Sequence, residues 1–191
     1  MTLSALGIFS AAGAGGGVSL SDFELIQTTL LTSGTSAFSF TGLGAYASTY
    51  KHLQLRFVQY NASVSPNQQE LNVRFNSSAG TYRQHTLSGN GTTAASSSSS
   101  RTSIPLSYYD PVFGTATSDF GILDILDFAS TTKNKTTRML YGAFRPSYPD
   151  RTVFLQSGAW FDTAAITSLD FVTSSANIVY PARFSLYGIK G

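Results

Sequence analysis

The chain has 191 residues, of which 42% are hydrophobic and only 12% are charged, and its formal net charge is +2 at pH 7. The hydrophobic content excludes an intrinsically disordered chain, and the small, scattered positive charge argues against a nucleic-acid-binding protein, which normally carries a basic surface. The lack of cysteine excludes disulfide bonds and thiolate metal sites, and no apolar run approaches the ~18 residues of a membrane span.

The opening of the chain, residues 1–17, contains no charged side chain and passes from apolar into small residues and then glycine. A secretory signal peptide begins with a positively charged region, whereas the first positive side chain here is Lys51. We therefore expect this segment to be retained and residues 1–21 to form an arm that anchors the protein on another subunit. The apolar anchors of this arm are Leu3, Leu6, Ile8 and Phe9.

Residues 22–191 are expected to form a single β-domain. Apolar and polar residues alternate with period two, as in 51–59, where Leu53, Leu55 and Phe57 share one face. About ten such segments, separated by turn signals and without a helical period, predict an all-β, jelly-roll-like antiparallel β-sandwich. The strands are expected at residues 23–31, 37–40, 51–59, 70–76, 82–87, 102–109, 120–128, 137–145, 152–161, 166–172 and 182–189.

Two segments rich in glycine or serine are predicted to lie outside strands. The serine run within 88–103 has no apolar face, which predicts an exposed, mobile loop. The segment TGLGAYA at 41–47 matches a dinucleotide-binding glycine pattern, but no helix or βαβ unit is expected around it. It is therefore predicted to be a turn in which Gly42 and Gly44 adopt unusual backbone angles.

The sequence predicts no catalytic, cofactor-binding or metal-binding residues. His52 and His85 lie in strand patterns and have no partner at a ligand spacing. Asp124 and Asp127 are three residues apart in an expected strand, which places them on opposite faces and excludes the carboxylate pair of a glycosidase. The chain also lacks the Gly-x-Ser-x-Gly elbow of serine hydrolases.

Two groups of side chains are left as candidates for surface contacts. Lys133, Lys135 and Arg138 form a basic cluster that we expect to be a solvated turn. Several aromatic rings could stack on sugars or partner proteins from an exposed β surface, and the alternative is that they belong to the core or to a subunit interface. These aromatic residues are Tyr108, Tyr109, Tyr141, Tyr148 and Trp160.

Five short segments carry a resemblance: FELI at 23–26, YKHLQLR at 50–56, DILD at 124–127, STTKNKTTR at 130–138 and RFSLYGIKG at 183–191. Together, in this order, they resemble a family of small virion structural proteins of tailed bacteriophages, notably aquatic ones. The alanine- and glycine-rich opening is also similar to that family. The resemblance spans nearly the whole chain, but the serine run at 96–100 and the segment FRPSYPD at 144–150 do not match the family pattern.

The resemblance implies a non-enzymatic protein on the exterior of a phage particle. The leading expectation is a homotrimer that decorates the capsid, with its arm bound to virion proteins such as the major capsid protein. The alternative is a short tail fibre or receptor-binding adhesin, attached to tail components, that recognises a host surface glycan. A carbohydrate-active enzyme is the third reading and is weakened by the missing carboxylate pair. No cofactor, nucleic acid or membrane is expected as a partner.

Overall fold

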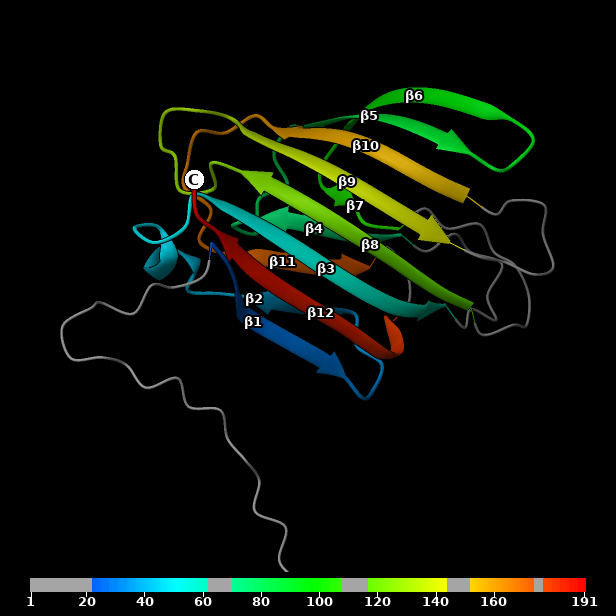
Figure 1. The fold of residues 1–191 in the computed structure, drawn as a ribbon, viewed down its shortest axis with the longest axis horizontal. Helices are drawn as coiled ribbons and strands as arrows, with labels where there is room; N and C mark the ends of the chain where they lie inside the picture. The colour runs from blue at the N-terminus through cyan, green and yellow to red at the C-terminus, as the bar shows by residue number, and fades with distance from the viewer. Residues whose placement is uncertain (1–21, 62–69, 108–116, 144–151, 174–176) are drawn as a thin grey trace, which may run out of the picture.

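The computed structural model describes residues 22–61, 70–107, 117–143, 152–173 and 177–191, which form two antiparallel sheets packed face to face (Figure 1). This confirms the predicted all-β sandwich. The larger sheet contains, in spatial order, β1 (Phe23–Leu31), β12 (Val179–Ile189), β3 (His52–Asn61), β8 (Thr117–Leu126), β9 (Lys135–Ala143), β10 (Thr152–Trp160), β5 (Tyr82–Gly89) and β6 (Ala94–Arg101). The smaller sheet contains β2 (Ala37–Phe40), β11 (Leu169–Thr173), β4 (Leu71–Phe75) and β7 (Ile104–Pro105).

The strand pairs are nested. β1 pairs with β12, β2 with β11, β3 with β8 and β4 with β7, so the chain crosses between the sheets and returns in the reverse order. This pairing order is compatible with a jelly roll. The remaining strands form two hairpins, β5–β6 and β9–β10, and both extend the larger sheet beyond β8. The smaller sheet lies behind the larger one in Figure 1, so the opposite, outer face of the larger sheet is turned to the viewer.

The core lies between the sheets and follows the predicted alternation. Leu53, Leu55 and Phe57 of β3 are buried, as expected from the sequence. The ring of Phe184 on β12 lies 6.0 Å from that of Phe57 and 5.4 Å from that of Phe171 on the smaller sheet. Burying each such side chain stabilises the fold by roughly 1.5–3 kcal/mol. Contacts of this kind therefore hold the two sheets together.

The serine-rich segment differs from its prediction, because residues 94–101 form the edge strand β6 rather than a loop. The side-chain carboxamide oxygen of Asn90 accepts the backbone N–H groups of Thr92 and Thr93, and Gly91 adopts a φ of 91°, which closes a tight turn. The backbone after the turn then pairs with β5. Backbone pairing does not require an apolar face, so the absence of one misled the prediction.

The glycine-rich segment contains a short 3-10 helix, η1 (Leu43–Tyr46), where a turn was predicted. Gly42 has a φ of 73°, in line with the unusual angle expected of it, but Gly44 does not have a positive φ. No helix in the described part of the chain has the length and hydropathy of a membrane span.

Candidate functional site

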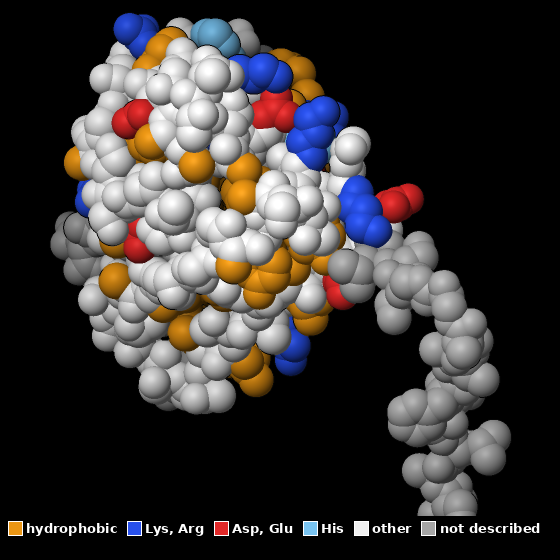
Figure 2. Space-filling view, turned by 90° about the vertical axis from the view of Figure 1, so that its left-hand side faces the viewer, with side chains coloured by type: hydrophobic (Ala, Val, Ile, Leu, Met, Phe, Trp, Pro, Cys, Tyr) orange, Lys and Arg blue, Asp and Glu red, His pale blue; other side chains and the backbone are white. Residues whose placement is uncertain are grey.

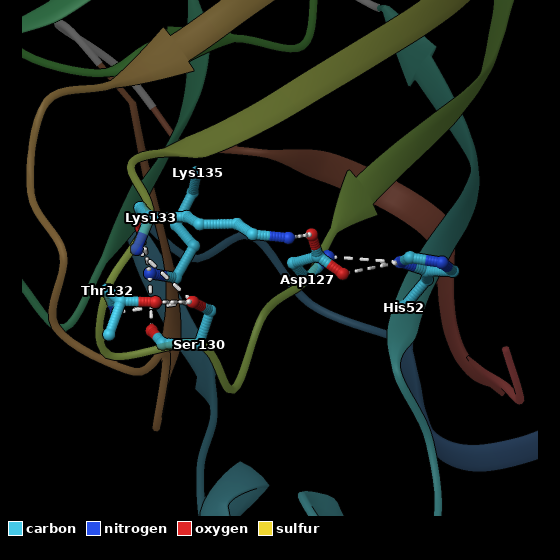
Figure 3. Close-up of polar contacts among 6 residues, drawn as sticks. All are labelled: His52, Asp127, Ser130, Thr132, Lys133 and Lys135. Atoms are coloured by element: carbon cyan, nitrogen blue, oxygen red, sulfur yellow. Dashed lines mark hydrogen bonds and ion pairs between the residues drawn. The ribbon is translucent and has the colours of Figure 1, made fainter.

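A cluster of titratable and hydroxyl side chains surrounds the turn between β8 and β9, at the same end of the sandwich as the C-terminus (Figures 1 and 3). β8 ends where Asp127 adopts a φ of 48°, a left-handed conformation that an extended strand cannot contain. The backbone N–H of Asp127 donates to Nδ1 of His52 at 3.0 Å, and Nζ of Lys133 donates to Oδ2 of Asp127 at 3.0 Å. The hydrogen bond from Lys133 holds the pKa of the Asp127 carboxyl below its ordinary value.

The cluster brings together the residue types of a catalytic triad, but not its geometry. A triad needs the serine hydroxyl bonded to the histidine and a carboxylate bonded to the other ring nitrogen. Among the described contacts, Ser130 Oγ accepts the backbone N–H groups of Thr132 and Lys133, at 3.3 and 3.2 Å. Nδ1 of His52 accepts a backbone N–H, and the nearer carboxylate oxygen of Asp127 is 3.9 Å away. The side chains therefore hold the turn rather than activate a nucleophile.

Lys135, the first residue of β9, binds the backbone of this turn and corrects the prediction that the whole basic cluster is solvated. Its side chain is fully buried, and its ammonium donates to the backbone carbonyls of Ser130, Lys133 and Thr163 at 2.7, 2.8 and 3.1 Å. Burial lowers the pKa of Lys135. The inward position of Lys135 follows from the alternation of β9, on which Met139 also faces the core. A lysine at an inward position of this alternating pattern is the sequence signal that could have predicted the burial of Lys135.

The other two members of the basic cluster are exposed, as predicted, but Arg138 lies in β9 rather than in a turn. The side chain of Lys133 is 65% exposed, and that of Arg138 projects from the outer face of the larger sheet. Arg138 binds Asp124, whose carboxylate also accepts a hydrogen bond from Gln54. Asp124 and Asp127 are thus held by different partners, and Asp127 lies after the strand in which it was expected.

A hollow of about 330 Å³ lies beside the turn and is lined by Lys51, Asp127, Lys133 and Gly191 among others. Its charges are of both signs. Figure 2 shows this end of the molecule, where basic side chains are interspersed with acidic ones rather than gathered in one patch. Such a surface gives neither an anion nor a cation an electrostatic advantage. Among the described residues, no group of histidine, aspartate and glutamate could hold a metal ion.

The aromatic candidates divide into two sets. Tyr141 and Trp160 are 0% and 2% exposed, and the ring of Trp160 stacks on that of Tyr82 at 6.1 Å, so both belong to the core and neither can stack on a ligand. They face inward because they occupy the inner positions of β9 and β10. The remaining candidates, Tyr108, Tyr109 and Tyr148, lie outside the described residues, as do the arm anchors Leu3, Leu6, Ile8 and Phe9.

The sequence analysis missed a group of large apolar side chains on the outer face of the larger sheet. Phe120, Leu140, Val153 and Leu155 are all exposed there. The signal was present in the segment 120–126, where apolar residues occupy both inward and outward positions instead of alternating with polar ones. A strand with apolar residues on both faces is typical of a sheet that is covered on both sides.

No protein family, curated protein or solved structure matches the chain in comparisons with known proteins. The function is therefore argued from the residues themselves. The polar cluster at the β8–β9 turn has a structural arrangement, and the outer face of the larger sheet has the composition of a contact surface.

Proposed function

We propose that this chain is a non-enzymatic structural protein of a tailed bacteriophage, carried on the outside of the particle as a capsid decoration protein. The observation that carries the proposal is the exposed apolar outer face of the larger sheet, because contiguous patches of this kind are typical of protein–protein contact sites. The resemblance of the segments between residues 23 and 191 supplies the class of particle. The structural arrangement of His52, Asp127 and Ser130 supports a role in assembly rather than catalysis.

In this proposal the arm, residues 1–21, docks on virion proteins such as the major capsid protein, while the β-domain, residues 22–191, remains outside. Burying each of the four apolar anchors contributes roughly 1.5–3 kcal/mol. Ordering residues 3–9, which carry the anchors, costs about 1–2 kcal/mol of backbone entropy per residue, so the cost is comparable to the gain. A single arm therefore binds weakly, and a homotrimer with three arms binds far more tightly because the second and third arms are held at high effective concentration.

The test is to delete residues 2–14 and mix the truncated protein with particles that lack it. We expect the truncated protein to show the same circular dichroism as the full chain and to stay in solution, whereas the full chain sediments with the particles. Equal attachment of both proteins would contradict docking by the arm. Attachment of the full chain only at the tail, together with loss of host adsorption when it is absent, would instead favour the adhesin that binds a host glycan.

A further inference from the structure

We propose that the outer face of the larger sheet binds a second copy of this chain through a stripe of six large apolar side chains. They point away from the smaller sheet and are 46–59% exposed. This inference names the surface for the self-association in the proposed function and therefore rests on it. The members of this outer stripe are Val58, Leu87, Phe120, Leu140, Val153 and Leu155.

The strand register places the first half of the outer stripe in one row across four strands. Val58 of β3 faces Phe120 of β8, and Gly142 of β9 lies in register between Phe120 and Val153 of β10. A Cβ atom on Gly142 would lie 2.9 Å from Cζ of Phe120. The Phe120 ring therefore lies across β9 in the space that the glycine leaves, which makes the row continuous.

The second half forms the adjoining row. Leu140 of β9 pairs with Leu155 of β10, which in turn pairs with Leu87 of β5. Six half-exposed side chains of this size present on the order of 600 Å² of apolar surface, the upper end of what a monomeric protein exposes. A stable interface buries about 800 Å² on each partner. The outer stripe thus supplies most of the area that an interface between two copies needs.

Some of the polar groups beside the outer stripe are paired within the chain. Asp124 binds Arg138 at 2.7 Å and Gln54 at 2.7 Å. The guanidinium of Arg56 lies 4.8 Å from the centroid of the Phe23 ring, over its face. An apolar centre with a polar rim is the usual anatomy of a protein interface.

A hollow next to the outer stripe indicates that the occupant is another copy. It has a volume of about 620 Å³ and is floored by the small side chains of Ser96, Ser98 and Ser157, with Leu87 and Leu155 at its border. The outer stripe, which projects as a ridge, and the hollow therefore lie on the same face of the chain. Each copy can place its outer stripe in the hollow of the next copy, which is the head-to-tail contact that closes a ring such as a trimer.

The experiment is sedimentation velocity on the full-length chain over a concentration series, with two matched variants. Leu140→Glu places a charge in the outer stripe, and Leu25→Glu places the same charge on β1, away from it; both leucines are 50% exposed. We expect the wild-type chain and Leu25→Glu to sediment as the same oligomer. Leu140→Glu should sediment as a monomer with an unchanged circular dichroism spectrum and melting temperature.

Two results would overturn the inference: a wild-type chain that is monomeric at every concentration, or an oligomer that Leu140→Glu leaves intact. A monomeric wild type whose attachment to particles is lost in Leu140→Glu would assign the outer stripe to another virion protein. If Leu140→Glu fails to fold, Leu155→Lys provides the same comparison in the neighbouring strand. Docking by the arm is tested separately on particles, so either proposal can fail without the other.

Discussion

The ammonium of Lys135 joins two separate segments of the chain, because its three hydrogen bonds go to carbonyls of the β8–β9 turn and to Thr163, which follows β10. Lysine provides three N–H donors, and here each has an acceptor. Satisfying all three offsets the cost of burying the charge. Lys135 thus links two segments of the chain at this end of the sandwich. Its hydrogen bonds to their carbonyls account for the burial of a charged side chain.

Replacing Lys135 with methionine tests this role. The variant keeps the apolar stem but leaves the three carbonyls without their donor, and we expect the free energy of unfolding to fall by roughly 1–3 kcal/mol. Urea denaturation measures the change. Lys133→Met is the control, because its exposed ion pair with Asp127 is worth about 0–1 kcal/mol. Equal losses of unfolding free energy in the two variants would show that the buried ammonium does not hold the two segments together.

Gly121 of β8 is required by close packing rather than by backbone angle. A Cβ atom at this position would lie 2.3 Å from Cζ of Phe57, whose ring is buried in the core. We expect Gly121→Ala to lower the free energy of unfolding by about 1–3 kcal/mol, because the ring must leave its place. In Gly44→Ala the nearest atom would be 3.8 Å away, so this control should change stability by less than about 0.5 kcal/mol. Thermal denaturation of the two variants measures this difference in stability.

At the scale of the elements, Asp170 of β11 stabilises the smaller sheet through hydrogen bonds to neighbouring segments. Its carboxylate accepts hydrogen bonds from the hydroxyls of Ser39 on β2 and of Ser168, and from the backbone N–H of Ser77 after β4. Partial burial alone would raise the pKa of Asp170, but these hydrogen bonds outweigh it and hold the pKa below its ordinary value of 3.8. The carboxylate therefore stabilises the fold in its charged form.

This shift predicts how stability depends on pH. The folded state binds fewer protons than the unfolded state, so the contribution of Asp170 is complete above pH 3.8 and is lost as the pH falls through the lower folded-state pKa. Asp127 adds a contribution of the same sign. We expect Asp170→Asn to be less stable at neutral pH and to lose less stability on acidification than the wild type does. Parallel curves of unfolding free energy against pH for the two proteins would contradict this assignment.

Most strands could be predicted from the sequence, because burial of one face imposes period two on the side chains. Phe23–Leu31 and Ala37–Phe40 match their predicted ranges, and the inward face of β3 is the one expected. β6 could not be found this way, since serine carries no burial signal and its strand forms through backbone pairing with β5. The nested pairing is equally absent from local patterns, because it joins residues as distant as Phe23 and Ile189.

The polar cluster was harder to predict than the strands. The pattern DILD placed Asp127 in a strand, but the residue ends that strand with a positive φ and so meets His52 and Lys133. The burial of Lys135 depends on carbonyls supplied by a segment 28 residues away. Contacts of this type arise from tertiary structure, and charge alone favoured the solvated alternative.

At the scale of the whole molecule, the two hairpins added to the nested strands widen the larger sheet and carry part of the outer stripe. Leu140, Val153 and Leu155 lie on β9–β10, and Leu87 lies on β5. One face of the extended sheet packs on the core, and the other is free to bind a neighbouring copy. In the proposed particle, the arm attaches each chain and the outer stripe joins the chains to one another, so the protein adds buried area between coat subunits.

The measurement that tests this account most directly is an image reconstruction of the proposed phage particle. The account predicts density for the β-sandwich on the outside of the head, repeated over the capsid lattice, with the outer faces of the larger sheets in contact. Density for the sandwich only at the tip of the tail, or none on the particle, would contradict it.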